Sequence, residues 1–566
     1  MRRLHRSLLA AALSKPLCRH RPPPPLLHRT PLRPHQALPF STRALTTPLP
    51  TPNAAPTALT TPPPTPNAAP TSQPTALASL EAAERKEAAG DHQEALDLAL
   101  KALAPLQETH GGWSLPVARA LRLAGAAAFR LNLLNDSLDS LEAAAEIVDS
   151  LLGAGAEEAA TVGAAVLDQL ARTKTAMGRR WDAVADLRRA LELKGRVLDG
   201  GCADACRDVA EAYVGVLCFD KALPLCLSAL EITVERFGDG SAEVAKVRQI
   251  LMVAYTGLGR NEDALEQNKL LRMVYEGLGM DVELSLAEID GAGLSILLGR
   301  TEDAMNDLKK VMNRASKDSE ERALAFVTMA KILCSQERLS DSRRCLEIAR
   351  ETLDSKRSAN PERTAGAYTE ISMLYESMTE FEMSLCLMKK TLAFLERVSG
   401  MHHIQGSISA RLGWLLLLTK RVDEAVPLLE KAVEKLKNCF GPLHFGLGFA
   451  YKHLGEANLE LNQLEAAVKF FVLASDIITA AFGPKHEDSI EILQLIANAY
   501  GLMGSYKHAE DYQLRVIAAY ESCGPDMSYE QREARRLLEQ LRKKAEGSPH
   551  AVFPANSLPV LPQDRE

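Results

Sequence analysis

The stretch that repeats through this chain reads Asp423-Glu424-Ala425-Val426 in one of its clearest copies. A polar or acidic residue precedes a small residue, an apolar residue follows it, and a polar turn stands before the motif. The other copies place the small residue at positions 95, 137, 183, 222, 264, 304, 342, 384, 467 and 509. The intervals range from 38 to 46 residues and average 41.4. A period held this closely indicates a repeat array.

A second small residue usually follows the first after seven positions, which is two helical turns, so both lie on one helix face. These second residues are Ala102, Ala144, Ala190, Ala229, Ala349, Ala432 and Ala474. Nine positions before the first small residue stand Tyr213, Tyr255, Tyr375 and Tyr500. Each unit is therefore predicted to be a helix–turn–helix pair, with a large side chain of the first helix over small residues of the second. Such pairs bury their apolar faces only by stacking.

The predicted fold is all-α: a right-handed superhelical solenoid of about eleven helix–turn–helix pairs with a period near 42 residues. It occupies residues 78–545, and the charged segment 531–544 is predicted to be a helix that caps its C-terminal end. Residues 44–77 are predicted to be a disordered linker, because they are rich in Pro and Thr and the segment 51–57 recurs unchanged at 65–71. The tail 546–566 is predicted to be disordered as well.

The first 80 residues differ sharply from the rest of the chain. They hold nine Lys and Arg residues and 18 of the 30 prolines, but no Asp, Glu or Gly. An Arg-rich, acid-free N-terminus is typical of an organellar transit peptide, and residues 1–43 are predicted to be one. The mitochondrial matrix is the expected location, with the chloroplast stroma as the alternative. The remaining 486 residues hold 57 basic and 73 acidic residues, a balance that argues against nucleic-acid binding.

The repeat pattern resembles the tetratricopeptide repeat, whose usual unit is about 34 residues long. The longer period and the loops between units are similar to those of the kinesin light chains. The loops read Phe237-Gly238-Asp239-Gly240, Phe440-Gly441-Pro442-Leu443-His444, Phe482-Gly483-Pro484-Lys485-His486 and Cys523-Gly524-Pro525-Asp526. Together with the leader, the chain resembles a plant kinesin-light-chain-related organellar protein. The resemblance implies a scaffold that binds a protein or peptide in a concave groove.

The candidate binding residues lie on the first helices of the last three units, on the face expected to line the groove. An apolar patch beside mixed polar residues suits an amphipathic helix or an extended segment. The alternative is that the tryptophan and leucines simply pack between units. The candidates are Trp414, Leu417, Leu418, Phe449, Lys452, Glu456, Gln494 and Asn498.

Histidine and cysteine residues do not form a convincing metal site in the sequence. Cys202 and Cys206 lack two further ligands nearby, so the ten cysteines are interpreted as buried free thiols. The pair His402-His403 is expected to lie at the surface of a loop between units. His444 and His486 recur after Gly-Pro, which predicts a structural role at the start of a helix.

No catalytic motif is found: phosphate-binding loop, zinc-protease motif and nucleophile elbow are all missing from the sequence. We therefore expect a non-catalytic scaffold without a cofactor or metal, binding an unidentified protein or peptide. No run of residues is long and apolar enough to predict a membrane span. One alternative is a cytosolic, kinesin-light-chain-like cargo or microtubule-linked adaptor, and another is an unrecognised enzyme or regulatory subunit. The end repeats are a candidate surface for self-association.

Overall fold

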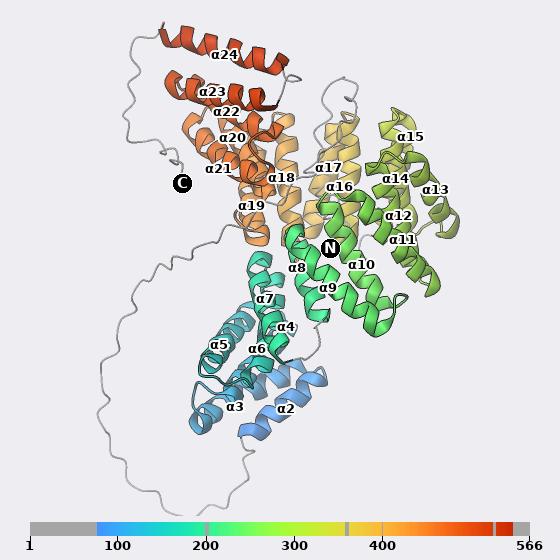
Figure 1. Cartoon of the computed structure of the whole chain (residues 1–566), viewed down its shortest axis with the longest axis vertical. Helices are drawn as coiled ribbons and strands as arrows, with labels where there is room; N and C mark the ends of the chain where they lie inside the picture. The colour runs from blue at the N-terminus through green and yellow to red at the C-terminus, as the bar shows by residue number, and fades with distance from the viewer. Residues whose placement is uncertain (1–75, 198–202, 357–360, 399, 524–527, 547–566) are drawn as a thin grey trace, which may run out of the picture. The chain divides into compact units, whose positions relative to one another are not determined.

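The computed structural model describes residues 76–197, 203–356, 361–398, 400–523 and 528–546. These residues form 23 helices in chain order, and no strand occurs among them (Figure 1). The predicted all-α repeat fold is therefore confirmed, with eleven helix–turn–helix pairs followed by one further helix. The predicted transit peptide, nearly all of the predicted linker and nearly all of the predicted tail lie outside the described residues, as does Cys202.

The helices are numbered as in Figure 1, and pairs 1 to 11 follow the chain. The first helices are α2 (Ala76–Ala88), α4 (Leu115–Arg130), α6 (Ala159–Ala176), α8 (Ala203–Gly215), α10 (Ala242–Gly257), α12 (Asp281–Leu297), α14 (Glu320–Ser335), α16 (Pro361–Ser377), α18 (His402–Leu418), α20 (Phe445–Glu460) and α22 (Glu487–Leu502). The second helices are α3 (His92–His110), α5 (Leu134–Gly153), α7 (Arg180–Val197), α9 (Phe219–Phe237), α11 (Asn261–Gly277), α13 (Thr301–Arg314), α15 (Leu339–Lys356), α17 (Phe381–Leu395), α19 (Val422–Phe440), α21 (Leu464–Phe482) and α23 (Tyr506–Cys523). The last helix, α24 (Ser528–Glu546), packs on α23 through Ala534 and Leu538.

Within each pair, the two helices are joined by a turn with one residue in the left-handed backbone region. This residue always stands five positions before the small residue of the motif, with φ between 58° and 83°. Such a residue ends a helix because the next amide bonds back to a carbonyl of the last turn, as Arg179 N does to Lys174 O at 2.8 Å. The eleven turn residues are Gly90, Asn132, Gly178, Leu217, Gly259, Gly299, Glu337, Thr379, Lys420, Asn462 and Gly504.

Small residues meet large ones in both directions inside a pair. The predicted packing of first-helix tyrosines is seen at Tyr375, which is 1% exposed. The glycines of first helices do the opposite, because they admit large side chains of the second helix. A Cβ added to Gly455 would lie 2.4 Å from the Phe471 ring, and one added to Gly413 would lie 2.5 Å from Leu429. The close approach of the two helices therefore depends on both sets of small residues.

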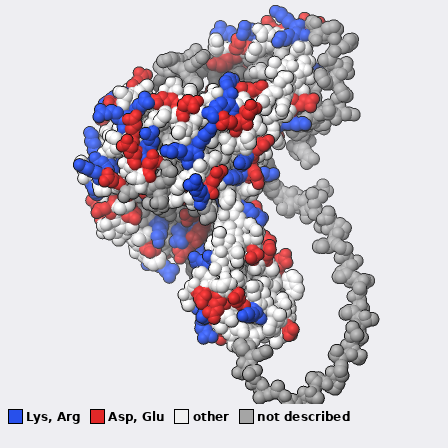
Figure 2. Space-filling view, turned by 180° about the vertical axis from the view of Figure 1, so that it is seen from behind, with Lys and Arg blue, Asp and Glu red and all other residues white. Residues whose placement is uncertain are grey.

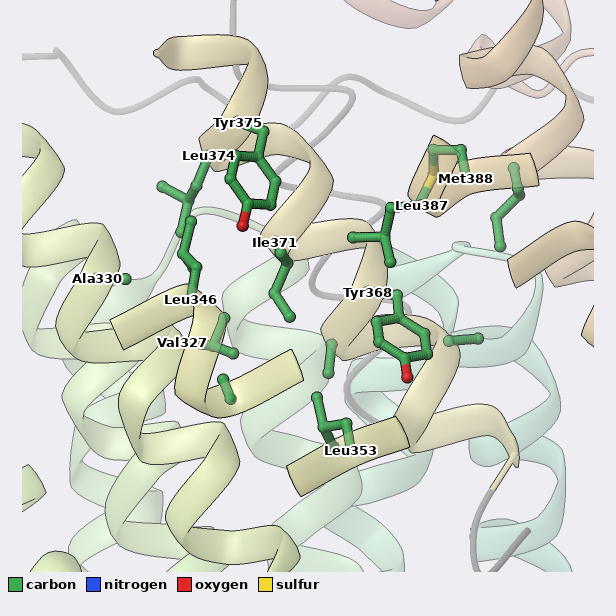
Figure 3. Packing of buried hydrophobic residues seen from close by; sticks show 14 of the residues in the cluster. Val327, Ala330, Leu346, Leu353, Tyr368, Ile371, Leu374, Tyr375, Leu387 and Met388 are labelled. Carbon is green, nitrogen blue, oxygen red and sulfur yellow. The ribbon is translucent and has the colours of Figure 1, made fainter. Parts of the chain in front are cut away.

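The apolar core is divided into several clusters along the chain, and each of the larger ones spans more than one pair. Figure 3 shows this between pairs 7 and 8, where Val327 and Leu346 of pair 7 pack with Tyr368, Ile371 and Tyr375 of α16. The Tyr368 hydroxyl donates to the Asp354 carboxylate at 2.5 Å, which satisfies the polar end of a buried ring. Since each pair contributes only part of a core, the pairs must stack to be stable.

A buried polar network links pairs 5 and 6. Arg272 of α11 forms an ion pair of 2.7 Å with Asp307 of α13, and both side chains are largely buried. The Asn268 amide donates to the carbonyl of Ala287 on α12 at 2.9 Å. Both Arg272 and Asn268 reach over Gly291, where a Cβ would lie 1.8 Å from Arg272 Nη2. The glycine therefore leaves the space that these two polar side chains fill.

The repeated loop histidines have the structural role that the sequence predicted. The Gly446 amide donates to His444 Nδ1 at 3.1 Å, and the Asp488 amide donates to His486 Nδ1 at 3.3 Å. Each ring also stacks on the phenylalanine that opens its loop, with centroids 4.6 Å apart for Phe440 and His444. These histidines therefore satisfy amides at the starts of α20 and α22.

Acidic and basic side chains are interspersed over the face shown in Figure 2. Many form ion pairs between successive units, such as Lys389 with Glu424 at 2.9 Å and Lys420 with Glu460 at 2.6 Å. Exposed pairs of this kind add little stability individually. In the described part of the chain, no helix is both long enough and apolar enough to cross a bilayer.

Candidate protein-binding surface

The first helix of pair 9 divides its side chains between the core and an open stripe. Ile408, Leu412, Leu415 and Leu416 are buried in the core. Arg411, Trp414 and Leu418 remain partly or fully exposed, and their spacing of three and four residues places them on one helix face. The stripe is therefore the part of α18 that intramolecular packing leaves available.

Trp414 lies near Arg411 of its own helix and near His453 of α20. The Arg411 guanidinium lies 5.5 Å from the centre of its indole, a cation–π distance. Arg411 is ion-paired with Glu376 of α16, and Arg411 Nε donates to Glu376 Oε1 at 3.2 Å. On the other side, the His453 ring of α20 lies 6.4 Å from the indole centroid. The first helices of pairs 8, 9 and 10 thus position one partly exposed tryptophan.

The charged candidates on α20 are already paired within the protein. Lys452 is 7% exposed, and its ammonium lies 2.8 Å from the Glu491 carboxylate of α22. Glu456 accepts from His453 Nδ1 at 2.9 Å. Burial opposes the charged form of Glu456, but the hydrogen bond and charge of His453 hold the pKa of its carboxyl below the ordinary value. Lys452 therefore acts as a link between units, whereas Glu456 remains partly exposed and is bonded to His453, the neighbour of Trp414.

The amide candidates lie on α22. Gln494 and Gln513 of α23 exchange two hydrogen bonds of 2.8 and 3.0 Å, and Gln494 also donates to Asn498 at 3.0 Å. Gln513 donates in turn to the Ala534 carbonyl of α24 at 3.1 Å. Gln494 is thus fixed by the packing of the last helices, while Asn498 is exposed.

Two apolar candidates, Leu417 and Phe449, pack mainly against other parts of the protein. Leu417 is 7% exposed and lies in the largest core cluster, because it stands on the side of α18 that faces its neighbours. Phe449 is partly buried, and its ring centroid lies 6.3 Å from that of Phe482 at the end of α21. Leu417, which we had expected to line the groove, is therefore buried, whereas Leu418 is 47% exposed.

Sequence reasoning missed Arg411 and His453, which complete the site. Arg411 stands three residues before Trp414, so the helical spacing could have revealed it. His453 lies on the next first helix, and its place beside Trp414 depends on how the two units stack. We define the Trp414 surface as Arg411, Trp414, Leu418, His453 and Glu456.

The expectation that His402 and His403 lie in a surface loop is wrong. α18 begins at His402, and His403 is 1% exposed. Burial and the positive charge of Arg180 lower the pKa of His403 to about 4, although Glu362 acts in the opposite direction. His403 is therefore a neutral, buried side chain at neutral pH.

This burial predicts that acid destabilises the protein through His403. Between the ordinary pKa of 6.5 and the folded value of about 4, the unfolded chain binds the proton and the folded chain does not. Stability therefore falls as the pH drops through that window, by up to about 3 kcal/mol. Urea denaturation at pH 7.5 and 4.5 should show a smaller acid loss in His403→Gln than in the native protein. An equal loss in both proteins would contradict the assignment.

The seven cysteines whose side chains the structure describes are free thiols of mixed exposure. Burial raises the pKa of Cys226 to about 12 and that of Cys439 to about 11, so both stay protonated. Cys386 is an exception to the expected burial, because it is exposed on α17. Within the described ranges, no group of three or more His, Cys, Asp or Glu side chains could hold a metal ion.

No family model matches the chain. It is distantly homologous to three kinesin light chain-related proteins of Arabidopsis thaliana. It is 25% identical to number 3 over 433 residues, which cover 75% of this chain and 66% of that protein. It is 24% identical to kinesin light chain-related protein 2 over 464 residues, which cover 79% of this chain and 70% of that protein. It is 27% identical to kinesin light chain-related protein 1 over 369 residues, which cover 64% of this chain and 60% of that protein. The chain thus spans roughly two thirds of the length of these relatives, as these 60–70% shares show.

Two solved structures are also similar. One is BtubC (BKLC) from P. vanneervenii, at 13% identity and a TM-score of 0.32, covering 50% of this chain and 99% of that one. The other is a signal-transduction ATPase of Pyrococcus horikoshii with a tetratricopeptide repeat sensor, at 15% identity and a TM-score of 0.40, covering 81% and 72%.

Proposed function

We propose that this chain, a distant relative of the plant kinesin light chain-related proteins, is a non-catalytic scaffold that binds a protein or peptide on its Trp414 surface. The observation that carries the proposal is the partly exposed indole of Trp414, held between Arg411 and His453. Tryptophan and arginine are the residue types most often responsible for affinity in protein interfaces. Arg411 is pre-positioned here by its ion pair with Glu376 of α16 and lies over the indole of Trp414, so little conformational entropy is lost on binding.

The chemistry of the surface indicates an amphipathic partner segment. Trp414 and Leu418 offer apolar contact, and Glu456 offers a partly exposed carboxylate on the next first helix. Further along, Glu491 and Asn498 of α22 are exposed. A helix or extended segment with an apolar side and a polar or basic edge would therefore fit.

The proposed place of action is an organelle, with the mitochondrial matrix first and the chloroplast stroma second. The support is the Arg-rich composition of residues 1–80, which hold no acidic residue. A cytosolic adaptor is the second candidate, favoured by the names of the Arabidopsis relatives. Imaging of fluorescent fusions with and without residues 1–80 separates the two. An imported protein should move from its organelle to the cytosol when residues 1–80 are removed. A cytosolic adaptor should be found in the cytosol in both forms.

The binding proposal predicts a large effect of one substitution. We expect Trp414→Ala to weaken partner binding about thirtyfold, since truncating a central aromatic of an interface costs about 2 kcal/mol. Affinity capture from isolated mitochondria and plastids would identify the partner, and titration of the purified partner would measure the loss.

Trp113→Ala is the matched control, because Trp113 is also exposed, at 61%, but lies in the loop before α4. A partner bound equally well by the native protein and both variants would overturn the Trp414 surface as the binding site. Circular dichroism of each variant would confirm that the helices persist.

A further inference from the structure

Two helix pairs early in the chain contact pairs that come much later. α7 of pair 3 touches α19 of pair 9, although the other substantial contacts of the described helices join near neighbours along the chain. In the turn before α7, a Cβ added to Gly178 would lie 2.9 Å from His402 Cβ. One added to Gly441, after α19, would lie 2.7 Å from the Trp181 ring. Both glycines therefore sit directly against side chains of the distant pair.

Pair 4 joins this contact through Leu217. Leu217 packs against a separate small core cluster. The cluster is formed by Ala432, Leu436, Cys439, Phe440 and Ala450. Leu217 has a φ of 60°, and at the equivalent place the other turns have glycine, asparagine or another polar residue. The left-handed region is unfavourable for a leucine, so the distant contact gives a reason for this residue type.

The centre of the contact is polar and poorly satisfied. Arg180 is 7% exposed. The described part of the chain offers its guanidinium no hydrogen bond or ion pair. Burial lowers the pKa of Arg180, and the charges of Glu362 and Glu211 act in the opposite direction. Burying a guanidinium without a close partner costs free energy. The contact is therefore a weak one, in which apolar packing is partly offset by the cost of burying Arg180.

The same contact reaches the helix that carries Trp414. Ala410 packs against the cluster that receives Leu217, and it lies next to Arg411 and one helical turn before Trp414. The N-terminal half of the exposed stripe on α18 is thus close to the docked turns. A partner that extends along α18 from Trp414 toward Ala410 would meet them.

We infer that the turns of pairs 3 and 4, residues 177–181 and 216–219, are a releasable occupant of the surface formed by α18 and α19. When the two turns are docked, they limit the Trp414 surface at the N-terminal side of α18. When they are released, a longer part of α18 becomes accessible. This inference rests on the proposed function for its role, but the docking itself is measured without a partner. It makes partner binding and release of the two turns coupled events.

The first test uses Trp181 as the reporter of a change in the other turn. In a protein carrying Trp113→Phe and Trp414→Phe, Trp181 is the remaining tryptophan. We expect Leu217→Asn to shift the docking equilibrium toward release about tenfold, because the burial of a leucine is lost while asparagine suits the left-handed turn. Acrylamide quenching of Trp181 should rise accordingly. Arg180→Met, which removes the buried charge, should lower the quenching.

The second test uses matched glycines and a distant reporter. Gly441 and Gly483 occupy the same loop position in successive pairs and share a φ of 88°, but no atom lies within 4 Å of a Cβ added to Gly483. With Ala410→Cys as a labelling site, the maleimide reaction at this position, followed by mass spectrometry, should be several-fold faster in Gly441→Ala than in Gly483→Ala.

Equal labelling in the two glycine variants, or unchanged Trp181 quenching in Leu217→Asn, would overturn the docking. If Gly441→Ala fails to fold, the Leu217→Asn measurement decides alone. Neither experiment uses the partner, so a failure here leaves the Trp414→Ala result standing. Conversely, a partner indifferent to Trp414 would remove the proposed function while the docking measurements remain valid.

Discussion

Gly291→Ala is expected to destabilise the protein by about 3 kcal/mol, the range seen when a buried ion pair is broken or a core is overpacked. The new methyl group would lie 1.8 Å from Arg272 Nη2 and 2.4 Å from Asn268 Oδ1. Arg272 would have to leave Asp307, whose side chain is only 16% exposed. Asp307 would then keep only Lys310, an exposed lysine of its own helix at 3.0 Å, as an ion-pair partner.

The control lies on the same helix. Gly293 has no atom within 4 Å of an added Cβ, so Gly293→Ala should stabilise the protein by up to about 1 kcal/mol through helix propensity. Because repeat arrays unfold in parts, hydrogen exchange resolved along the chain is the appropriate measurement. Relative to the native protein, Gly291→Ala should exchange faster in α11, α12 and α13. Its exchange in α21 and α22 should change much less. Equal stability of the two variants would contradict the packing assigned to Gly291.

The second large effect concerns Gly455 and Phe471 in pair 10. Phe471→Ala should cost about 4 kcal/mol, because the ring is fully buried and its loss leaves a cavity. Gly455→Ala should cost about 2 kcal/mol in the native background, since the added Cβ would lie 2.4 Å from the ring. In the Phe471→Ala background the obstacle is gone, and Gly455→Ala should instead stabilise by roughly 1 kcal/mol.

This change of sign is the measurable signature of direct contact. Native-state hydrogen exchange in α20 and α21 of the four proteins gives the coupling energy, for which we expect about 3 kcal/mol. Additive effects would show that Gly455 and Phe471 do not pack against each other. The corresponding cycle on Gly413 and Leu429 should give coupling of the same sign, because the same position of pair 9 packs in the same way.

The sequence predicted the helix pairs because each pair packs mainly on its neighbours. A pattern of small residues repeated about every 42 positions therefore contains most of the information that the pairs need. The cap histidines His444 and His486 were predictable for the same reason, since each acts within its own loop. The constant left-handed turn residue was not predicted, because its side chain varies from glycine to Leu217 and Glu337.

The candidate site was only partly predictable. Helical spacing placed Trp414 and Leu418 on one face, and the structure leaves both at least partly exposed. It could not distinguish them from Leu417, which lies in the core, or from Lys452, which binds Glu491. These outcomes depend on the angle at which one pair stacks on the next, and that angle results from many side chains acting together.

The number, order and type of the secondary elements thus follow from local periodicity alone, because helix formation and pair packing are short-range. The exposure of Trp414, the burial of His403 and the docking of Leu217 beside α19 follow from tertiary packing. Their physical cause is the small rotation between successive pairs. Summed over several pairs, it brings residues far apart in the chain into contact, and no single repeat encodes that sum.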